Sequence, residues 1–247
     1  MFDPKKEIEN NIKTMKPDWT KLDYTTTDRG LKKPAPEKFK QAHDHASIVE
    51  LLSVFPNITQ KTLTECIQNR RSLRKYADCQ ITFEELSYLL FETSRVKYHK
   101  GSAVFRTIPT GGATNGMETY FYSKNVEGLE EGIYLYLQDK HAISLWIKAD
   151  DLETLVNNAT QKQLRGAPIV FFFTAVPYRS VYKYSFTAHK MLLLEAGHAC
   201  QNLSLAAEVI ESGCVALCAY NQTLSDQLLN LDGLDEFVTY IVPLGKR

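Results

Sequence analysis

The sequence predicts an α+β fold, with a mainly antiparallel sheet flanked by helices, and three observations support this class. The expected elements run as helices, a strand meander, a helix, a strand, a long helix and a last strand, not as the regular strand–helix alternation of parallel sheets. No G-x-G-x-x-G motif follows an expected strand, so a dinucleotide-binding parallel sheet has no support. With 247 residues, 44% of them hydrophobic, the chain can bury the core of one large domain.

Residues 1–60 differ in composition from the rest and are predicted to form an N-terminal extension. They are rich in Lys, Thr, Asp and Pro, which favours a segment wrapped over the surface. Short helices are expected near Lys5–Lys13 and Ser47–Phe55. The main domain is then expected to span residues 61–247.

The first half of the main domain is expected to contain two helices followed by a strand meander. Thr82 is a favourable N-cap for the second helix, and Glu84 and Glu85 would interact well with the positive end of its dipole. The expected segments are the helices Thr62–Asn69 and Phe83–Thr93, the strands Thr119–Ser123 and Ile133–Leu137, and a candidate third strand, His141–Ile147.

The second half is expected to combine a central strand with one long helix. Ile169–Ala175 is the most apolar run of the chain, which indicates a buried strand. The other expected elements are the helices Asp150–Gln163, Met191–Ile210 and Leu224–Leu231, and a last strand, Phe237–Val242.

The long helix Met191–Ile210 is apolar on most sides, so it is expected to be buried. Its small residues, among them Ala196, Gly197 and Ala199, would allow a second helix to approach closely. Two interpretations follow. The helix lies at a dimer interface, or it is the core helix of a monomer.

Charge and cysteine content exclude several classes of function. Lys plus Arg equals Asp plus Glu at 29 each, which argues against broad nucleic-acid binding. No apolar signal segment opens the chain and no uncharged run reaches membrane-span length, so we expect a cytoplasmic protein without a membrane partner. The five cysteines include no C-x-x-C pair, and no histidine spacing suits a metal, so no metal site is expected.

The basic segment that follows the first helix of the main domain could hold a phosphate. Alternate residues of an extended segment project to the same side, so Arg70, Ser72 and Arg74 would form one surface. Two guanidinium groups with a hydroxyl between them can bind a phosphate through charge-assisted hydrogen bonds. Lys246 and Arg247 could complete such a pocket. The alternative is a solvated charged face.

Five short blocks occur in an order that is characteristic when they are taken together. They are Arg70-Arg71-Ser72-Leu73-Arg74, Pro109-Thr110-Gly111-Gly112-Ala113, Glu127-Gly-Leu-Glu-Glu-Gly-Ile-Tyr134, Glu195-Ala-Gly-His-Ala-Cys-Gln-Asn202, and Leu231-Asp-Gly-Leu-Asp-Glu236 with Gly245. In this order they resemble the FMN-dependent nitroreductase superfamily, and most closely its SagB-type dehydrogenase branch.

This resemblance implies a nitroreductase-like fold, FMN as the cofactor, and a homodimer with two FMN sites at its interface. The long helix would lie at the dimer interface. The residues that it places near FMN are Arg70, Arg71, Ser72, Arg74, Pro109, Thr110, Gly111, Gly112, Gln201, Ala216, Leu217, Lys246 and Arg247. Backbone N–H groups of the segment around Ala216 would stabilise negative charge on the reduced flavin ring.

Lys183 and Tyr184 match a Lys-Tyr pair that is implicated in proton removal in azoline-oxidising relatives. A lysine desolvated beside a cofactor can act as a base, because burial lowers its pKa. The alternative for Val-Tyr-Lys-Tyr is a surface loop with amphipathic side chains.

The leading functional hypothesis is an FMN-dependent oxidoreductase with ping-pong turnover, in which NAD(P)H reduces the flavin and a small nitroaromatic or quinone acceptor reoxidises it. The second is an azoline dehydrogenase that modifies a peptide with a cyclodehydratase partner. The third is a non-catalytic flavin-binding module. It is motivated by Asn115-Gly116, Ala216 and Cys218, where the chain departs from the family pattern.

Overall fold

The computed structural model describes residues 3–247 and contains one seven-stranded antiparallel sheet with helices on both faces. The strand order is β1-β6-β5-β4-β7-β9-β8, and a separate hairpin is formed by β2 and β3. The strands are β1 (Ile48–Glu50), β2 (Val96–Lys100), β3 (Ala103–Arg106), β4 (Met117–Ser123), β5 (Gly132–Leu137), β6 (Ala142–Ile147), β7 (Ile169–Ala175), β8 (Ser212–Cys214) and β9 (Phe237–Lys246).

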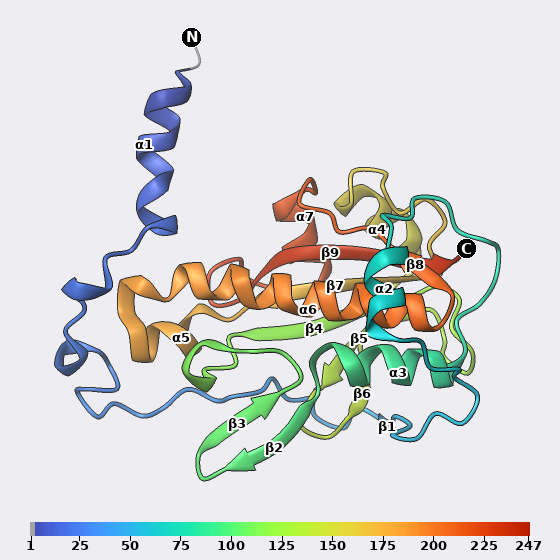
Figure 1. The fold of residues 1–247 in the computed structure, drawn as a ribbon, viewed down its shortest axis with the longest axis horizontal. Coiled ribbons are helices and arrows are strands. Elements are labelled where there is room, and N and C mark those ends of the chain that lie inside the picture. The colour runs from blue at the N-terminus through green and yellow to red at the C-terminus, as the bar shows by residue number, and fades with distance from the viewer. Residues whose placement is uncertain (1–2) are drawn as a thin grey trace.

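The helices divide between the two faces of this sheet (Figure 1). The long helix α6 crosses one face with α2 and α3 beside it, whereas α4 and α7 cover the opposite face. The helices are α1 (Pro4–Met15), α2 (Leu63–Asn69), α3 (Phe83–Ser94), α4 (Leu152–Ala159), α5 (Pro177–Tyr184), α6 (His189–Val209) and α7 (Gln222–Leu228).

Strand alternation builds two separate cores from one central strand. In β7, Phe171 and Phe173 pack in the core under α6, while Val170 and Phe172 pack in the core under α4 and α7. All four side chains are fully buried. The antiparallel α+β class is therefore confirmed, with Ile169–Ala175 as the predicted buried strand.

Local sequence signals set the ends of the first two helices of the main domain. Thr62 and Thr82 each cap a helix, and each forms a reciprocal capping box with a glutamate three residues later, Glu65 and Glu85. Both helices start within one residue of the predicted positions.

The prediction of a helix at Ser47–Phe55 is wrong, because Ile48–Glu50 forms the edge strand β1. Its backbone pairs with β6, with Ile48 opposite Ser144. The β-branched pair Ile48-Val49 suits a strand, and the open edge of β6 offers it backbone partners. Part of the N-terminal extension therefore completes the main sheet.

Residues 18–45, which we call the strap, run from α5 along the edge of the molecule towards β1 (Figure 1). Preceding the strap, α1 projects away from the body and buries none of its residues. In the part of the chain that the structure describes, no helix combines the length and the apolar character that a membrane crossing needs.

The small residues of α6 are distributed over both of its sides. Ala196, Ala199, Ala206 and Ala207 are buried inside this chain, so they serve its own core. The opposite stripe faces solvent and consists of Leu193, Leu194, Gly197, His198 and Gln201.

Candidate functional site

The basic segment predicted to hold a phosphate lies along the edge strand β8. Ser72 forms a parallel bridge with Cys214, and the Leu73 N–H donates to the Cys214 carbonyl at 3.0 Å. A Cβ on Gly213 would lie 2.8 Å from the Leu73 Cβ, so the two backbones approach closely only because residue 213 is glycine. The segment is therefore held extended, as the alternation argument requires.

The arginines of this segment are not neutralised by carboxylates. The ion pairs within residues 3–247 include none of Arg70, Arg71 and Arg74. Arg71 instead donates to the Gln68 carbonyl at 2.7 Å. Arg70 is half-buried, whereas Ser72 and Arg74 are exposed. The segment thus presents uncompensated positive charge and a hydroxyl at one edge of the sheet.

The charge of Arg70 acts on two buried thiols, Cys214 and Cys200. Burial raises the pKa of Cys214 to about 11, and the nearby Arg70 guanidinium partly opposes this shift. Burial likewise raises the pKa of Cys200 to about 12. Both thiols are therefore protonated near neutral pH, and they line the back of the basic segment without reactive thiolate character. Cys218, by contrast, is exposed.

The basic C-terminus comes close to this segment through its backbone, but its side chains have carboxylate partners. The Ala77 N–H donates to the Lys246 carbonyl at 3.0 Å. Lys246 Nζ pairs with Glu85 and also donates to the Ile210 carbonyl at 2.8 Å. Arg247 pairs with the buried Glu208. In this chain the structure therefore does not bring these two charged groups to the arginines.

A glycine loop, residues 109–113, lies at the other end of α6. A Cβ on Gly111 would lie 1.8 Å from Met191 Cε. Gly112 has φ +60, and a Cβ there would lie 1.8 Å from the Tyr184 hydroxyl. The left-handed φ favours glycine at Gly112, whereas a Cβ at Gly111 would require the flexible end of Met191 to move.

The loop borders a cavity of about 550 Å³. Its lining comes from β3 and from the loop itself, and includes Phe105, Pro109, Thr110, Gly112 and Ala113. This volume falls within the usual range of small-molecule sites.

Lys183 and Tyr184 end α5 and reach this same loop. Lys183 Nζ donates to the Gly112 carbonyl at 3.1 Å and lies 5.1 Å from the centre of the Tyr184 ring. The Lys183 ammonium and the Tyr184 hydroxyl both lie within 2.8 Å of the point where a Gly112 Cβ would be. The pair is therefore at a structured site, on a helix rather than on the alternative surface loop.

In the segment after β8, backbone N–H groups that pair with β9 alternate with N–H groups that have no acceptor within residues 3–247. Val215 and Leu217 donate to the β9 carbonyls of Pro243 and Ile241, at 3.1 and 2.8 Å. Ala216 and Cys218 alternate with them, are exposed, and have no acceptor for their N–H groups within residues 3–247. Gln201 lies on the exposed stripe of α6.

The predicted residues thus form two clusters in one chain. The Arg70 charge reaches the Cys200 thiol on α6, whereas the glycine loop contacts Met191, nine residues earlier on the same helix. A helical rise of 1.5 Å per residue separates these two points by about 14 Å along the helix axis.

Buried charges that sequence reasoning missed lie behind the glycine loop. Arg106 pairs with Glu195 at 3.2 Å, and both side chains are almost fully buried. Arg179 pairs with Glu118 at 2.6 Å. Burial lowers the pKa of Arg106 and raises the pKa of Glu195, while their mutual attraction opposes both shifts. Arg106 and Glu195 do lie in or near the quoted blocks, and that is the only sequence signal for them.

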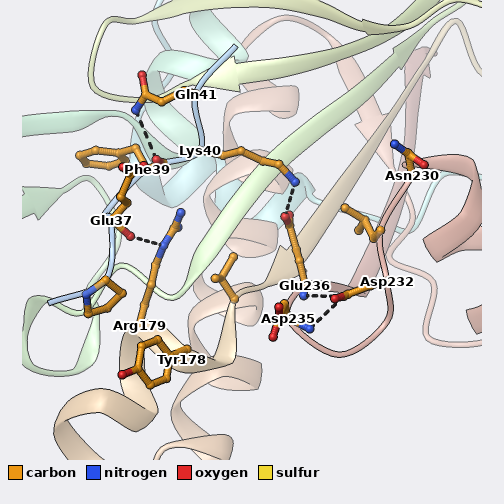
Figure 2. Close-up of a pocket in the computed structure, with 13 residues that line it drawn as sticks. Glu37, Phe39, Lys40, Gln41, Tyr178, Arg179, Asn230, Asp232, Asp235 and Glu236 are labelled. Carbon is orange, nitrogen blue, oxygen red and sulfur yellow. Dashed lines mark hydrogen bonds and ion pairs between the residues drawn. The ribbon is translucent and has the colours of Figure 1, made fainter. Parts of the chain in front are cut away.

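A second cavity, of about 610 Å³, opens where the strap meets α5 and the turn before β9 (Figure 2). Lys40 reaches across it to Glu236 at 2.5 Å, and Arg179 donates to the Glu37 carbonyl at 2.8 Å. No cluster of three or more His, Cys, Asp or Glu side chains suited to a metal occurs in residues 3–247.

Comparison with known proteins gives matches over most of the chain. The sequence pattern described as "Nitroreductase family" matches residues 67–246. A candidate nitroreductase of Methanocaldococcus jannaschii is 29% identical over 193 residues, which cover 78% of this chain and 94% of that protein.

Three solved structures share the fold at low sequence identity. A candidate nitroreductase of Anabaena variabilis superposes with a TM-score of 0.68 at 21% identity over 98% of this chain, which spans only 44% of that protein. A chain of the E. coli microcin synthetase McbBCD complex, solved with truncated pro-MccB17 bound, superposes with a TM-score of 0.62 at 17% identity. The match covers 100% of this chain and 94% of that chain. A candidate nitroreductase of Desulfovibrio desulfuricans, solved with FMN, superposes with a TM-score of 0.50 at 18% identity. The match covers 76% of this chain and 87% of that chain.

The matched residues 67–246 contain both clusters described above and every strand of the main sheet except β1. The family pattern covers well over half of the 247 residues. The chain therefore belongs to the nitroreductase family of oxidoreductases.

Proposed function

We propose that the protein is an FMN-dependent oxidoreductase that takes electrons from NAD(P)H and passes them to a small planar acceptor. The observation that carries this proposal is the group of arginines without carboxylate partners beside Ser72 on the edge of β8. Paired guanidinium groups and a hydroxyl suit a phosphate monoester. Family membership makes FMN the phosphate-bearing ligand that this segment would hold.

The residues present suit the rest of FMN as well. The free N–H groups of Ala216 and Cys218 face away from β9 and can donate to a polar ring edge. The cavity of about 550 Å³ that the glycine loop borders could receive a flat ring. When bound, FMN would accept a hydride from the nicotinamide and pass it to the acceptor.

A homodimer would bring the two clusters onto one ligand. Within one chain they are separated by about 14 Å along α6. The exposed stripe of α6, which contains Leu193 and Leu194, offers the apolar surface for a second copy. Each ligand would then contact the basic segment of one protomer and the glycine loop of its partner.

Lys183 and Tyr184 would handle the proton that accompanies the hydride. An acceptor that gains a hydride at one atom needs a proton at another, and the Tyr184 hydroxyl beside Gly112 can donate it. The Lys183 ammonium stabilises the resulting phenolate, which regains its proton from solvent.

A second candidate is oxidation of an azoline ring in a peptide, as in the SagB-type branch. Its support is that the fold matches a chain of the peptide-modifying microcin synthetase complex over the full length of this protein. The chemistry would then run in reverse: Lys183 or Tyr184 in its deprotonated form would take a proton from the ring, and FMN, when bound, would accept the hydride.

The deciding experiment is an absorbance spectrum of the purified protein, followed by anaerobic addition of NADH or NADPH and then of 1,4-benzoquinone. We expect flavin absorbance that is bleached by a nicotinamide and restored by the quinone. Protein that binds no added FMN would refute the proposal. Bound FMN that only a peptide azoline reduces would favour the second candidate, and FMN that nothing reduces would favour a non-catalytic flavin-binding module.

A further inference from the structure

The strap is attached along the whole length of α5, the helix that ends at Lys183 and Tyr184. Four hydrogen bonds join the two segments: Tyr178 Oη to Asp28 Oδ2 at 2.8 Å, the Arg29 N–H to the Tyr182 carbonyl at 2.9 Å, Tyr182 Oη to the Lys33 carbonyl at 2.9 Å, and Arg179 Nε to the Glu37 carbonyl at 2.8 Å. Donors come from both segments, so the strap and α5 form one unit.

At the end of this unit, two aromatic rings of the strap contact Tyr184. Trp19 packs edge-on against the Tyr184 ring at 5.6 Å between centroids, and Tyr24 does so at 6.4 Å. Edge-to-face packing of this kind restricts how a phenol ring can rotate. The two rings therefore limit the motion of the Tyr184 ring.

The far end of the strap is fixed to the main sheet. Lys40 reaches Glu236 (Figure 2). The other carboxylate oxygen of Glu236 accepts hydrogen bonds from Tyr120 and Thr174. The Lys40 N–H also donates to the buried Glu118 at 2.7 Å. Next along the chain, His43 stacks on Trp146 at 3.8 Å. Residues 28–43 of the strap are therefore attached both to α5 and to the main sheet.

Tyr184 needs such support because its own backbone provides little. The helix ends at this residue, and the following Ser185 has φ 47 and ψ −134, outside the helical region. No hydrogen bond restrains the Tyr184 hydroxyl within residues 3–247, and the side chain is only half-buried. Its position over Gly112 thus depends on packing from the strap.

We propose that Trp19, with Tyr24, is a positioning residue that holds the Tyr184 hydroxyl over Gly112, so that the strap is a working part of the active site. This role rests on the proposed function, in which Tyr184 supplies the proton to the acceptor. The strap would act on the half-reaction that needs this proton. It would have no part in hydride transfer from the nicotinamide, which requires no proton from the protein.

The test compares the two half-reactions in the full-length flavoprotein by anaerobic stopped flow. NADH or NADPH measures flavin reduction, and 1,4-benzoquinone measures reoxidation. The variants are Trp19→Ala, the conservative Trp19→Phe, and Tyr184→Phe. Leu31→Ala is the matched control, because Leu31 is an exposed apolar residue of the same strap, 58% accessible.

We expect Trp19→Ala to slow reoxidation about tenfold and to raise its solvent deuterium isotope effect, because proton transfer becomes limiting. Flavin affinity, melting temperature and the rate of flavin reduction should match the wild type. Trp19→Phe should restore most of the rate, Leu31→Ala should have no effect, and Tyr184→Phe should be at least as slow as Trp19→Ala.

Two results would overturn the positioning role alone: an unchanged reoxidation rate in Trp19→Ala, or a slower rate that falls together with flavin affinity and melting temperature. A normal rate in Tyr184→Phe would remove the proton-donor role of Tyr184 and the positioning role with it, while leaving the flavin chemistry standing. Wild-type protein without FMN would instead refute the proposed function itself.

Discussion

The Tyr184 hydroxyl lies 1.8 Å from the place that a Cβ would take on Gly112, so the missing side chain of one residue accommodates the other. The relationship links α5 to the glycine loop in space, although 71 residues separate Lys183, the neighbour of Tyr184, from Gly112. It also explains why the loop needs glycine here before any ligand is considered.

Gly112→Ala should therefore affect both stability and activity. A left-handed φ of +60 costs a non-glycine residue about 1–2 kcal/mol, and the new methyl group would displace Tyr184. Gly101→Ala is the matched control, because Gly101 has φ +57 and open space around its Cβ position. In urea unfolding both variants should lose stability, but only Gly112→Ala should lose quinone reductase activity. Equal activity losses would contradict this reading.

The basic segment should determine FMN affinity. Replacing Arg70 or Arg74 with alanine removes a charge-assisted phosphate contact, which contributes about 1.5–3 kcal/mol, so FMN should bind roughly 10- to 100-fold more weakly. Lys148→Ala is the control, since Lys148 is an exposed cation paired with Glu130. Flavin fluorescence titration measures the affinities. Similar losses in Lys148→Ala would show a general charge effect instead of a specific contact.

Several parts of this arrangement could be predicted from the sequence because their signals are local. The capping residue Thr82 marked the start of the second helix, and the apolar run Ile169–Ala175 marked the central strand. In each case neighbouring residues determine the structure.

Most of the other parts depend on distant partners and left no local signal. β1 is a strand because β6 has an open edge. The hairpin of β2 and β3 does have a local signal, the two-residue turn Gly101-Ser102, from which we did not predict it. The predicted grouping of Lys246 and Arg247 with the arginines did not anticipate that Glu85 and Glu208 lie next to them. Ion pairs such as Arg106–Glu195 join residues 89 positions apart, which no periodicity reveals.

The buried pair of Arg106 and Glu195 should be sensitive to the loss of either partner alone. Glu195→Met leaves the Arg106 guanidinium buried without a carboxylate, which should cost about 3–5 kcal/mol of unfolding free energy. The double variant Arg106→Met/Glu195→Met buries no charge at this place and should be more stable than Glu195→Met. Urea unfolding of the wild type, the single variants Glu195→Met and Arg106→Met, and the double variant checks this cycle. Additive losses would argue that the two residues do not interact.

His141 should make the attachment of β1 depend on pH. Burial lowers the pKa of this imidazole, whose Nδ1 lies 2.7 Å from Tyr136 Oη and whose Nε2 lies 2.8 Å from the Leu52 carbonyl. Because the unfolded chain binds the proton more readily, stability should be complete above the ordinary pKa of 6.5 and should fall as pH drops through the lowered value. His141→Asn, which tolerates the φ of 47 at this position, should flatten the melting-temperature profile between pH 7 and about pH 5. An unchanged slope would assign the pH dependence to another group.

The exposed stripe of α6 should decide both the oligomeric state and flavin binding. Leu193 is 58% accessible, and a charge in its place would have to be desolvated if a second copy covers it. Leu193→Asp should therefore yield a folded monomer in analytical ultracentrifugation. Because the basic segment and the glycine loop would come from different protomers, this monomer should also bind FMN far more weakly than the wild type. Leu155→Asp, at an exposed position on α4, should change neither property. A monomeric Leu193→Asp protein with unaltered FMN affinity would show that one chain holds the whole cofactor.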